Sequence, residues 1–488
     1  MDLLQGTLLL IAYALLTGCA LRAVFTGRYR TATWLIFTLA LLLRVFMAGD
    51  LFLHEWDERF HAVIAKNIWS SPFAPRLYTD GVLTYDFARW SESDLWLSKP
   101  FLPFWVMGGS IALFGSNEFG LRLPSVLIGL VSVWVTLRLG TELFGRKPGL
   151  VAAFLHAIHG MVLEMSGGLI SSDHVDTLFT LLFQLGLWAY VRSWSNRATW
   201  RFLLVGFLVG LAFLTKWVMA FFVLPVLAGV HWGKRKSLRA FSCDLALVGV
   251  GFLVTTLPWM VYLYRHFPEE ITLIFTQFLG RSGASFEGHG GGFFFYFEDA
   301  LILFGAGALV AVGWVSCVAV RKLRPRHLLL FLWIVLPLTL LTFMSTKRST
   351  YLIMSAPAYF LTTALCACWL VRQPWKPWGR IVAVSLLLGL PVQYSVERLK
   401  PFAPRFVWPE WRLNFERHIT RTVQVSGVLA PGQPVVLQKE SRPFHVMFYR
   451  DDIIAYPRVL RPEEITRLER AGFHVVPYEG ADAGAGER

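Results

Sequence analysis

Two acids and two histidines stand close together in "LFLHEWDERFHAVIAKNIW", where His54, Asp57, Glu58 and His61 fall within eight residues. On a helix, His54 and Glu58 are four positions apart, and so are Asp57 and His61, so we expect all four side chains to share one face. Such a face could perform acid–base chemistry with a carboxylate, or hold a divalent metal ion with imidazole and carboxylate ligands. The alternative is a solvated helix start, where acids are favourable near the N-terminus.

A second pair of acids, Asp173 and Asp176, occurs in "GGLISSDHVDTLFTLLF", where an apolar run begins. Acids next to a membrane-embedded segment cost free energy, which indicates a functional role. Capping of a helix N-terminus is the alternative.

Four cations stand at ends of apolar runs in "SKPFLP", "LTKW" and "STKRSTY": Lys99, Lys216, Lys347 and Arg348. Each one alone could extend its charge to lipid headgroups. Together they favour an anionic ligand such as a lipid phosphate, which lysine binds as a point charge and arginine as a fork. His289, in the glycine-rich "FEGHGGG", is a further candidate for a metal or phosphate site.

The elements that must position these residues are membrane spans. Of the 488 residues, 55% are hydrophobic and 16% are charged, against about 25% charged in a soluble domain. Apolar runs of the length needed to cross a bilayer predict an all-α polytopic membrane protein with about twelve spans. The predicted spans lie near residues 3–24, 31–49, 121–142, 148–165, 176–192, 200–215, 217–232, 240–263, 293–320, 327–344, 350–371 and 380–396.

Basic residues predict the topology of these spans. Every second connection is basic, as in "FGRKPG" and "RKLRPRH", and the positive-inside rule makes these connections cytoplasmic. The acids and cations above, and both termini, are then expected outside. The net charge of +14 is thus assigned to topology and anionic headgroups, not to nucleic-acid binding. All five cysteines lie in apolar runs without zinc-type spacing, so we expect neither a zinc site nor disulfides.

Two outer connections are long, residues 50–120 and 265–292, and connections of that length are usually functional or built from short elements. The first contains "KPFLPFWVMGGSIALFG", apolar but broken by two prolines. We predict a juxtamembrane helix in the outer interface here, not a crossing.

The composition changes after residue 396. We therefore predict a transmembrane catalytic domain over residues 1–396, with both long outer loops, and a small outer α/β domain over 397–488. Within the latter, "PVVLQ", "FHVMFYR" and "FHVVPY" are expected as strands, and "RPEEITRLERAG" as a helix with Pro462 near its start and Gly472 at its end. The tail "EGADAGAGER" is expected to be disordered.

No nucleotide-binding loop or serine-hydrolase elbow occurs in a suitable context. An enzyme that transfers a group at the outer face of the membrane would therefore need an activated donor carried by the membrane.

The sequence resembles a known family in several segments. The segments "HEWDERFHAVIAKNIW", "KPFLPFWVMGGSIALFGSNEFGLRLPS", "DTLFTLLFQLGLWAY", "GLAFLTKW" and "STKRSTYLIMSAPAYFL" come in the order seen in GT-C glycosyltransferases. The resemblance is greatest to the protein O-mannosyltransferases and the bacterial aminoarabinose transferases of lipid A, and it runs from about residue 31 to 371.

The resemblance implies transfer of a sugar from a polyprenyl-phosphate donor, with inversion, to a lipid, glycan or protein acceptor. The reaction would occur at the outer face of a bacterial inner (plasma) membrane, with the C-terminal domain on the periplasmic side. It implies a catalytic role for Asp57, with Glu58 beside it. The second acid of the family falls on Asp176, with Asp173 as the competing match.

The family also implies a donor-phosphate site. Lys99 matches a lysine that contacts the phosphate, and Lys347, Arg348 and Tyr351 match a basic–aromatic element near the same pocket. Lys216 is grouped with them as a cation, and His289 matches an outer-loop histidine that some members place near a metal.

This chain departs from the family pattern at three places: "KPFL" replaces "KPPL", "TKW" replaces "TKG", and Ser98 stands where some relatives have a metal-binding acid. A divalent ion, with His54, His61 and His289 as candidate ligands, therefore remains open. Two other functions also remain open: a glycan ligase that uses a polyprenyl-diphosphate carrier, and a transporter of lipids or anions. The transporter is disfavoured because the sequence contains no clear internal repeat.

Overall fold

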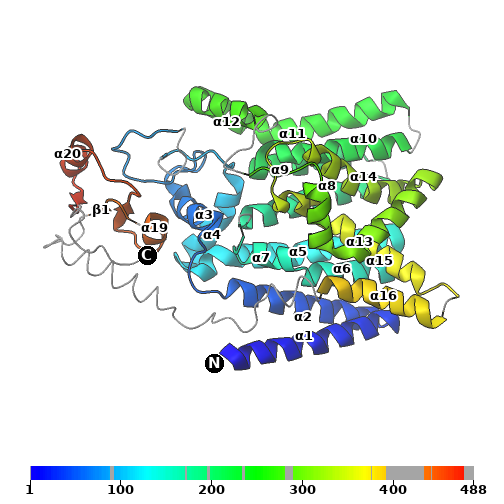
Figure 1. Ribbon diagram of the computed structural model, residues 1–488. Helices are drawn as coiled ribbons and strands as arrows, with labels where there is room; N and C mark the ends of the chain where they lie inside the picture. The colour runs from blue at the N-terminus through cyan, green and yellow to red at the C-terminus, as the bar shows by residue number, and fades with distance from the viewer. Residues whose placement is uncertain are drawn as a thin grey trace. The chain divides into compact units, whose positions relative to one another are not determined.

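The computed structural model describes residues 2–87, 93–170, 173–194, 198–233, 237–280, 289–374, 376–391, 434–440 and 442–477. The chain forms two compact units (Figure 1). The first, here called the helical unit, comprises residues 1–50 and 122–403. The second, here called the composite unit, comprises residues 51–121 and 404–488. The predicted tail after residue 478 and the whole segment 392–433 lie outside the described residues.

The helical unit consists of long apolar helices that pack side by side (Figure 1). Its helices are α1 (Asp2–Phe25), α2 (Tyr29–Ala48), α5 (Glu118–Phe144, whose first residues belong to the composite unit), α6 (Arg146–Ile158), α7 (Gly160–Ser166), α8 (His174–Arg192), α9 (Thr199–Lys216), α10 (Val223–Gly233), α11 (Leu238–His266), α12 (Pro268–Gly280), α13 (Phe295–Lys322), α14 (Pro325–Thr342), α15 (Ala356–Leu370) and α16 (Lys376–Pro391), with the 3-10 turns η2 (Trp217–Phe222) and η3 (Ser349–Ser355).

Within the described part of the chain, eight helices are long and apolar enough to cross a membrane, or nine if the bent pair α6–α7 counts as one span. The count of about twelve spans is therefore not confirmed, although every predicted range overlaps a helix. Breaks between helices account for part of this difference in the number of spans. For example, the predicted spans 200–215 and 217–232 form one apolar stretch of 35 residues, Thr199–Gly233, which is interrupted by η2.

The bend between α6 and α7 measures 56° and falls at His159, whose backbone is extended. A helix that breaks inside an apolar bundle leaves backbone carbonyls without intrahelical partners. The fully buried Arg44 donates hydrogen bonds to Ala157 O at 3.1 Å and to Ala40 O at 3.3 Å. His159 Nε2 donates to Leu303 O at 2.9 Å. These side chains therefore stabilise the broken span from inside the unit.

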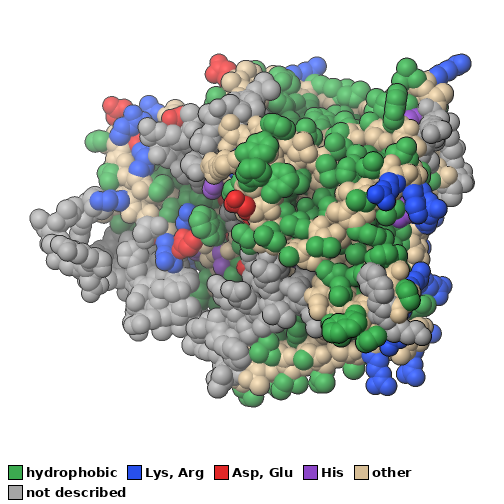
Figure 2. All heavy atoms as spheres, turned by 45° about the vertical axis from the view of Figure 1, so that its right-hand side comes forward, with side chains coloured by type: hydrophobic (Ala, Val, Ile, Leu, Met, Phe, Trp, Pro, Cys, Tyr) green, Lys and Arg blue, Asp and Glu red, His purple; other side chains and the backbone are tan. Residues whose placement is uncertain are grey.

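Basic connections between helices meet at one end of the helical unit. Lys147 Nζ lies 4.6 Å from the ring centroid of Phe25 at the end of α1, and Arg326 near the start of α14 donates to Leu143 O at 3.3 Å. Figure 2 shows Lys and Arg side chains gathered at this end, beside a broad hydrophobic surface. Connections predicted to be cytoplasmic therefore share one side of the unit.

The composite unit combines the first long connection with the C-terminal segment. The connection forms α3 (Asp57–Asn67), the 3-10 turn η1 (Ile68–Ser70) and α4 (Leu102–Phe114). The 13 residues of α4 extend about 20 Å at 1.5 Å per residue, which is too short to cross a bilayer, as the sequence predicted. A Cβ on Gly108 of α4 would lie 2.5 Å from Ala65 O, so the close approach of α3 and α4 requires glycine there.

The C-terminal segment folds as β1 (Val435–Leu437), α19 (Pro443–Tyr449), β2 (Ile453–Ala455), α20 (Pro462–Arg470) and β3 (His474–Val475). The three strands form a parallel sheet in the order β2-β1-β3. The helix predicted at "RPEEITRLERAG" is confirmed as α20, and Gly472 follows it with a φ of 91°. The predicted strands at "PVVLQ" and "FHVVPY" are confirmed as β1 and β3.

The prediction of a strand at "FHVMFYR" was wrong, because these residues form α19, and the strand β2 was not predicted. Two adjacent parallel strands need a crossover connection, usually a helix, and α19 is the crossover from β1 to β2. Residues Pro443–Phe448 are all buried, so the segment shows no alternation that would distinguish a helix from a strand.

Contacts between distant parts of the chain hold the composite unit together. Phe60 of α3 packs on Phe444 of α19 with ring centroids 4.3 Å apart. Tyr78 stacks on Tyr456 with centroids 4.7 Å apart. Residues 50–120 and 397–488 were predicted to belong to separate domains, whereas the structure groups the described parts of both in one unit.

Candidate functional site

The acids of the second motif lie at the N-terminus of α8. Asp173 is fully buried and caps the helix by accepting a hydrogen bond from Val175 N at 3.1 Å. Asp176, in the first turn, is 3% exposed and forms an ion pair with Lys216 of α9. Asp173 therefore caps the helix, which was the alternative interpretation of these acids, whereas Asp176 forms an ion pair with a cation.

Lys216 is the last residue of α9, and its charge is enclosed by aromatic rings as well as by Asp176. Its Nζ lies 5.2 Å from the ring centroid of Tyr351 and 5.9 Å from that of Phe179. A cation over an aromatic face is stabilised by the ring quadrupole, more strongly when water is excluded. Lys216 is only 9% exposed, so removal of one charge from the pair would leave the other buried and uncompensated.

The segment that contains Lys347 and Arg348 joins α14 to η3. The side chain of Lys347 is buried and donates to Thr342 O at 2.8 Å. The guanidinium of Arg348 donates to His289 Nε2 at 2.8 Å, so this ring nitrogen acts as an acceptor. The N–H of Lys347 donates to His289 O at 2.9 Å. His289 thus contacts both cations.

Sequence reasoning missed Tyr296 and Asp299, which both lie in the first turns of α13. Arg348 N donates to Tyr296 Oη at 3.2 Å, and Lys347 Nζ lies 5.7 Å from the Tyr296 ring centroid. Asp299 is 8% exposed. An acid at the end of an apolar run was the available signal for Asp299, as for Asp176, but nothing distinguishes Tyr296 from other aromatic residues in "GGFFFYFED".

The structure therefore brings together, within the helical unit, most of the predicted cations and their neighbours. These are Asp176, Lys216, His289, Lys347, Arg348 and Tyr351, with the additional Tyr296. They lie at the end of the helices opposite the basic connections, because α8 and α13 begin here and α9 and α14 end here. A set of buried and half-buried cations, tyrosines and one paired acid is suited to bind a phosphate group.

The first motif lies in the composite unit, where α3 begins at Asp57. His54 and Glu58 were predicted to share one face of a helix, but His54 lies before α3, and the two residues meet at the turn into the helix. Glu58 Oε2 lies 2.7 Å from both the backbone N and the Nδ1 of His54. Glu58 is fully buried and fixes the turn into the helix. Asp57 remains half-buried, so it is the more accessible of the two acids.

The candidate metal ligands of the first motif have other contacts. His54 precedes α3 and contacts Glu58, and the ring of His61 packs against Trp96 and Phe104. Across the described ranges, no group of three or more His, Cys, Asp or Glu residues is arranged to hold a metal ion. The described residues of the first motif therefore do not form a metal site.

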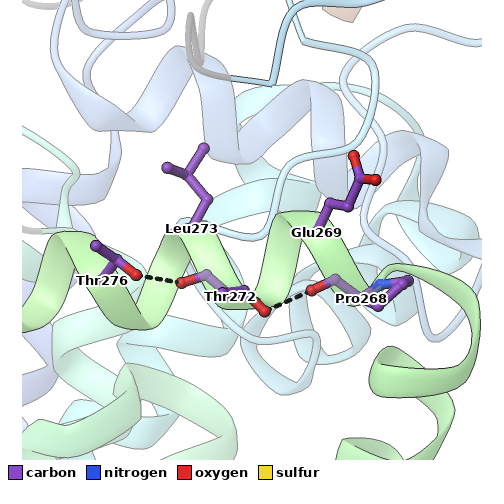
Figure 3. A pocket seen from close by; sticks show the side chains of 5 residues that line it. All are labelled: Pro268, Glu269, Thr272, Leu273 and Thr276. Atoms are coloured by element: carbon purple, nitrogen blue, oxygen red, sulfur yellow. Dashed lines mark hydrogen bonds between the residues drawn. The ribbon is translucent and has the colours of Figure 1, made fainter.

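Lys99 lies half-buried in the bend before α4. A separate shallow pocket lies along α12 (Figure 3), where the Thr272 hydroxyl donates to Pro268 O at 2.7 Å and that of Thr276 to Thr272 O at 2.8 Å. Glu269 and Leu273 complete its lining. None of these residues belongs to the predicted site.

Comparison with known proteins identifies the fold. The structure superposes on the crystal structure of ArnT from Cupriavidus metallidurans bound to undecaprenyl phosphate with a TM-score of 0.65 and 16% identity, covering 91% of this chain and 89% of that one. It superposes on the oligosaccharyltransferase AglB of Archaeoglobus fulgidus with a TM-score of 0.56 and 14% identity, covering 86% and 64%. The protein is therefore a multi-span membrane protein with the GT-C fold.

Sequence similarity narrows the class. Residues 98–262 match the family model of dolichyl-phosphate-mannose-protein mannosyltransferases. The undecaprenyl phosphate-alpha-4-amino-4-deoxy-L-arabinose arabinosyl transferase of Erwinia tasmaniensis is 29% identical over 273 residues, 53% of this chain and 47% of the relative. A second such transferase, from Pseudomonas fluorescens, is 26% identical over 308 residues, 60% and 50%. The chain is therefore similar in sequence to these mannosyl and aminoarabinosyl transferases, and it spans about half the length of the two arabinosyl transferases.

Proposed function

We propose that this protein is an inverting glycosyltransferase that moves a sugar from a polyprenyl-phosphate donor to an acceptor at the outer face of a bacterial inner membrane. The observation that carries the proposal is the cluster of the buried Lys216 and Lys347 with the half-buried Arg348 at one end of the helical unit. The positive-inside rule disfavours cations at this end, so an anionic ligand is the reason for their presence. The names of the relatives agree with a polyprenyl-phosphate ligand.

In the proposed reaction, an acceptor oxygen attacks the anomeric carbon of the sugar. The new bond from acceptor oxygen to carbon forms as the bond from carbon to phosphate oxygen breaks, and this single displacement inverts the configuration. Asp57 would take the proton of the acceptor hydroxyl or orient it. The phosphate is a good leaving group, and Lys99, Lys347 and Arg348 would stabilise the charge it gains. Asp176 would hold Lys216 among the phosphate-binding groups.

We further propose that the composite unit and both termini lie on the periplasmic side. The clustering of basic connections at the other end of the helices supports this orientation. The acceptor is proposed as a lipid, glycan or protein, with lipid A as one candidate by analogy with the names of the relatives.

The test uses the full chain in lipid nanodiscs with a panel of polyprenyl-phosphate sugars and a bacterial membrane extract as acceptor. Release of free polyprenyl phosphate, measured by mass spectrometry, should occur with one donor. Arg348→Gln should reduce the rate by about 10²-fold, the usual loss when one charge-stabilising group is removed. Asp57→Asn should also abolish most release. Arg321→Gln is the matched control, because Arg321 is exposed in the last turn of α13.

Lack of release from every donor, with acceptors present, would contradict the proposal. If polyprenyl-diphosphate glycans were consumed instead, the protein would be a glycan ligase. Movement of donor or anion across the bilayer without chemical change would identify a transporter. An Asp57→Asn variant with full activity would remove Asp57 from the mechanism while leaving the transferase class intact.

A further inference from the structure

The turn that leads into α3 has an unusual backbone. Phe52 has a φ of 75°, although only glycine adopts such values without a steric cost. Both Phe52 and Leu53 are buried, at 2% and 3% exposure. A strained conformation of this kind persists only where surrounding contacts enforce it. The contacts around Phe52 and Leu53 therefore determine the direction in which the chain enters α3.

Residues from distant parts of the chain make these contacts. Phe52 N donates to Glu118 Oε1 at 2.7 Å, and Leu53 N donates to Tyr449 Oη at 3.0 Å. The Tyr449 hydroxyl in turn donates to the same Glu118 oxygen at 2.9 Å. His445 Nε2 donates to Leu53 O at 3.1 Å. Two side chains of α19 therefore bind both polar backbone groups of Leu53.

The remainder of α19 is fastened along α3. The rings of Phe444 and Phe60 are in contact. Lys66, in the last turn of α3, donates to Met447 O at 2.7 Å and to Arg450 O at 3.1 Å. A lysine that binds free carbonyls at a helix C-terminus stabilises that end of the helix. Consequently α19 contacts the start, the middle and the end of α3.

The imidazole of His445 is suited to a permanent contact. It is 1% exposed, and burial lowers the pKa of His445, so the ring is neutral near pH 7. Its bond to a carbonyl oxygen requires the proton on Nε2. The contact to Leu53 O therefore does not depend on a charged ring.

We propose that the C-terminal segment is a positioning element for the acid Asp57, in which Tyr449 and His445 hold the backbone of Leu53 and thereby aim the first turn of α3. This inference rests on the proposed transferase function. A carboxylate that accepts a proton must lie within hydrogen-bond reach of it, and misplacement by about 1 Å can cost 10²-fold in rate. Neither positioning residue touches the substrate in this scheme.

The test compares four variants of the full chain in nanodiscs. Tyr449→Phe removes only the hydroxyl group, and His445→Leu removes the donor to Leu53. His445→Gln keeps a donor at the place of Nε2. Thr466→Ala is the control, because Thr466 is exposed on α20 of the same segment. Two properties are measured for each: kcat and KM for donor-dependent release of polyprenyl phosphate, and hydrogen exchange of a peptide covering residues 52–61.

Tyr449→Phe and His445→Leu should lower kcat about tenfold and leave the KM for the donor unchanged, since neither variant changes a cation assigned to the donor phosphate. His445→Gln should restore most of kcat, and Thr466→Ala should change nothing. Amide exchange in residues 52–56 should quicken by about five- to tenfold in the two impaired variants, as expected for loss of one hydrogen bond.

Full kcat in Tyr449→Phe and His445→Leu, with an active wild type, would overturn this inference alone. Unchanged exchange in both variants would also overturn it, because α19 would then not hold the turn. A wild type that releases nothing from any donor would overturn the proposed function, and with it any catalytic role for the positioning of Asp57. The activity of the wild type therefore distinguishes the two failures.

Discussion

Lys216 and Trp217 are consecutive residues at the end of α9. Lys216 ends α9 and pairs with Asp176. Trp217 follows it with φ 45° and ψ −137°, a backbone conformation in which glycine has no steric penalty. The sharp turn at this position ends the helix and keeps the lysine at its terminus.

The backbone conformation at Trp217 predicts which of two variants at this position is the more stable. Trp217 is 1% exposed and packs against Trp259 and Phe275, so Trp217→Gly and Trp217→Ala should each lose about 3–5 kcal/mol. Glycine should nevertheless be the more stable replacement by up to about 1 kcal/mol, because alanine retains the strain of a positive φ. Thermal unfolding in detergent measures the difference.

Ala220, three residues further on, provides the matched control. It lies in η2 and is also buried, and it is not among the residues with positive φ. Ala220→Gly should therefore lower stability by about 0.5–1 kcal/mol. If Trp217→Ala proved more stable than Trp217→Gly, backbone strain at this position would not be significant.

The types of many site residues could be predicted from the sequence, but their partners could not. Acids and cations at the ends of apolar runs indicated Asp176, Lys347 and Arg348 because charges are costly there. The pairing of Asp176 with Lys216 joins residues 40 positions apart, which no local pattern reports. The structure also distinguishes the roles of Glu58 and Asp57, because it shows that Glu58 is buried and stabilises the turn into α3.

At the scale of elements, α20 depends on a carboxylate with an unusual ionisation. Arg458 donates two hydrogen bonds to Glu464, at 2.7 and 2.8 Å. These bonds, followed by the backbone N–H of Arg461, lower the pKa of Glu464 from 4.5 to about 2. The carboxylate therefore stabilises the folded segment fully above pH 4.5, and this contribution disappears as the pH falls toward 2.

Glu464→Gln should accordingly reduce the stability of the C-terminal segment at pH 7 by about 1.5–3 kcal/mol, the range for hydrogen bonds to charged groups. Near pH 2.5 the variant and the wild type should differ much less. Hydrogen exchange of residues 453–477 in the full chain measures both values. Glu463→Gln, on the exposed side of the same turn, is the control, and an equal loss at both pH values would contradict the assignment.

The prediction of elements succeeded where a local signal was strong. Pro462 and Gly472 mark the ends of α20, and long apolar runs mark the helices of the helical unit. It failed at α19, where a short, mostly apolar run without alternation fits a strand or a helix equally well and the parallel sheet decides between them. It also could not predict the break at His159, because the hydrogen bonds of Arg44 that support the break come from another helix.

For the whole molecule, the grouping of residues 51–121 with 404–488 predicts mutual dependence. A chain that ends at Ala403 should leave the apolar partners of α19, such as Phe60, exposed. Limited proteolysis should then cut within residues 51–121, while the helical unit remains protected. A chain that ends at Pro477 is the control and should retain protection. Equal protection in both chains would show that the first long connection folds by itself.

Long-range assembly of this kind is the feature least accessible to the sequence. Apolar periodicity, caps and charge bias act over a few turns, so they indicate helices, spans and topology. The contact between Phe60 and Phe444, or between Lys66 and the end of α19, depends on complementary surfaces separated by most of the chain. Such contacts connect the first motif with the C-terminal segment.

The same arrangement has a consequence for biosynthesis. The ribosome completes residue 121 long before it reaches Val435, the start of β1; the two positions are 435 − 121 = 314 residues apart. At about 5–20 residues per second, the first half of the composite unit waits roughly 15–60 seconds for its partner. During that interval the turn around Phe52 lacks Tyr449 and His445, so Asp57 acquires its final environment only after Tyr449 has been made. A newly made chain would therefore gain activity late, after its membrane helices have already inserted.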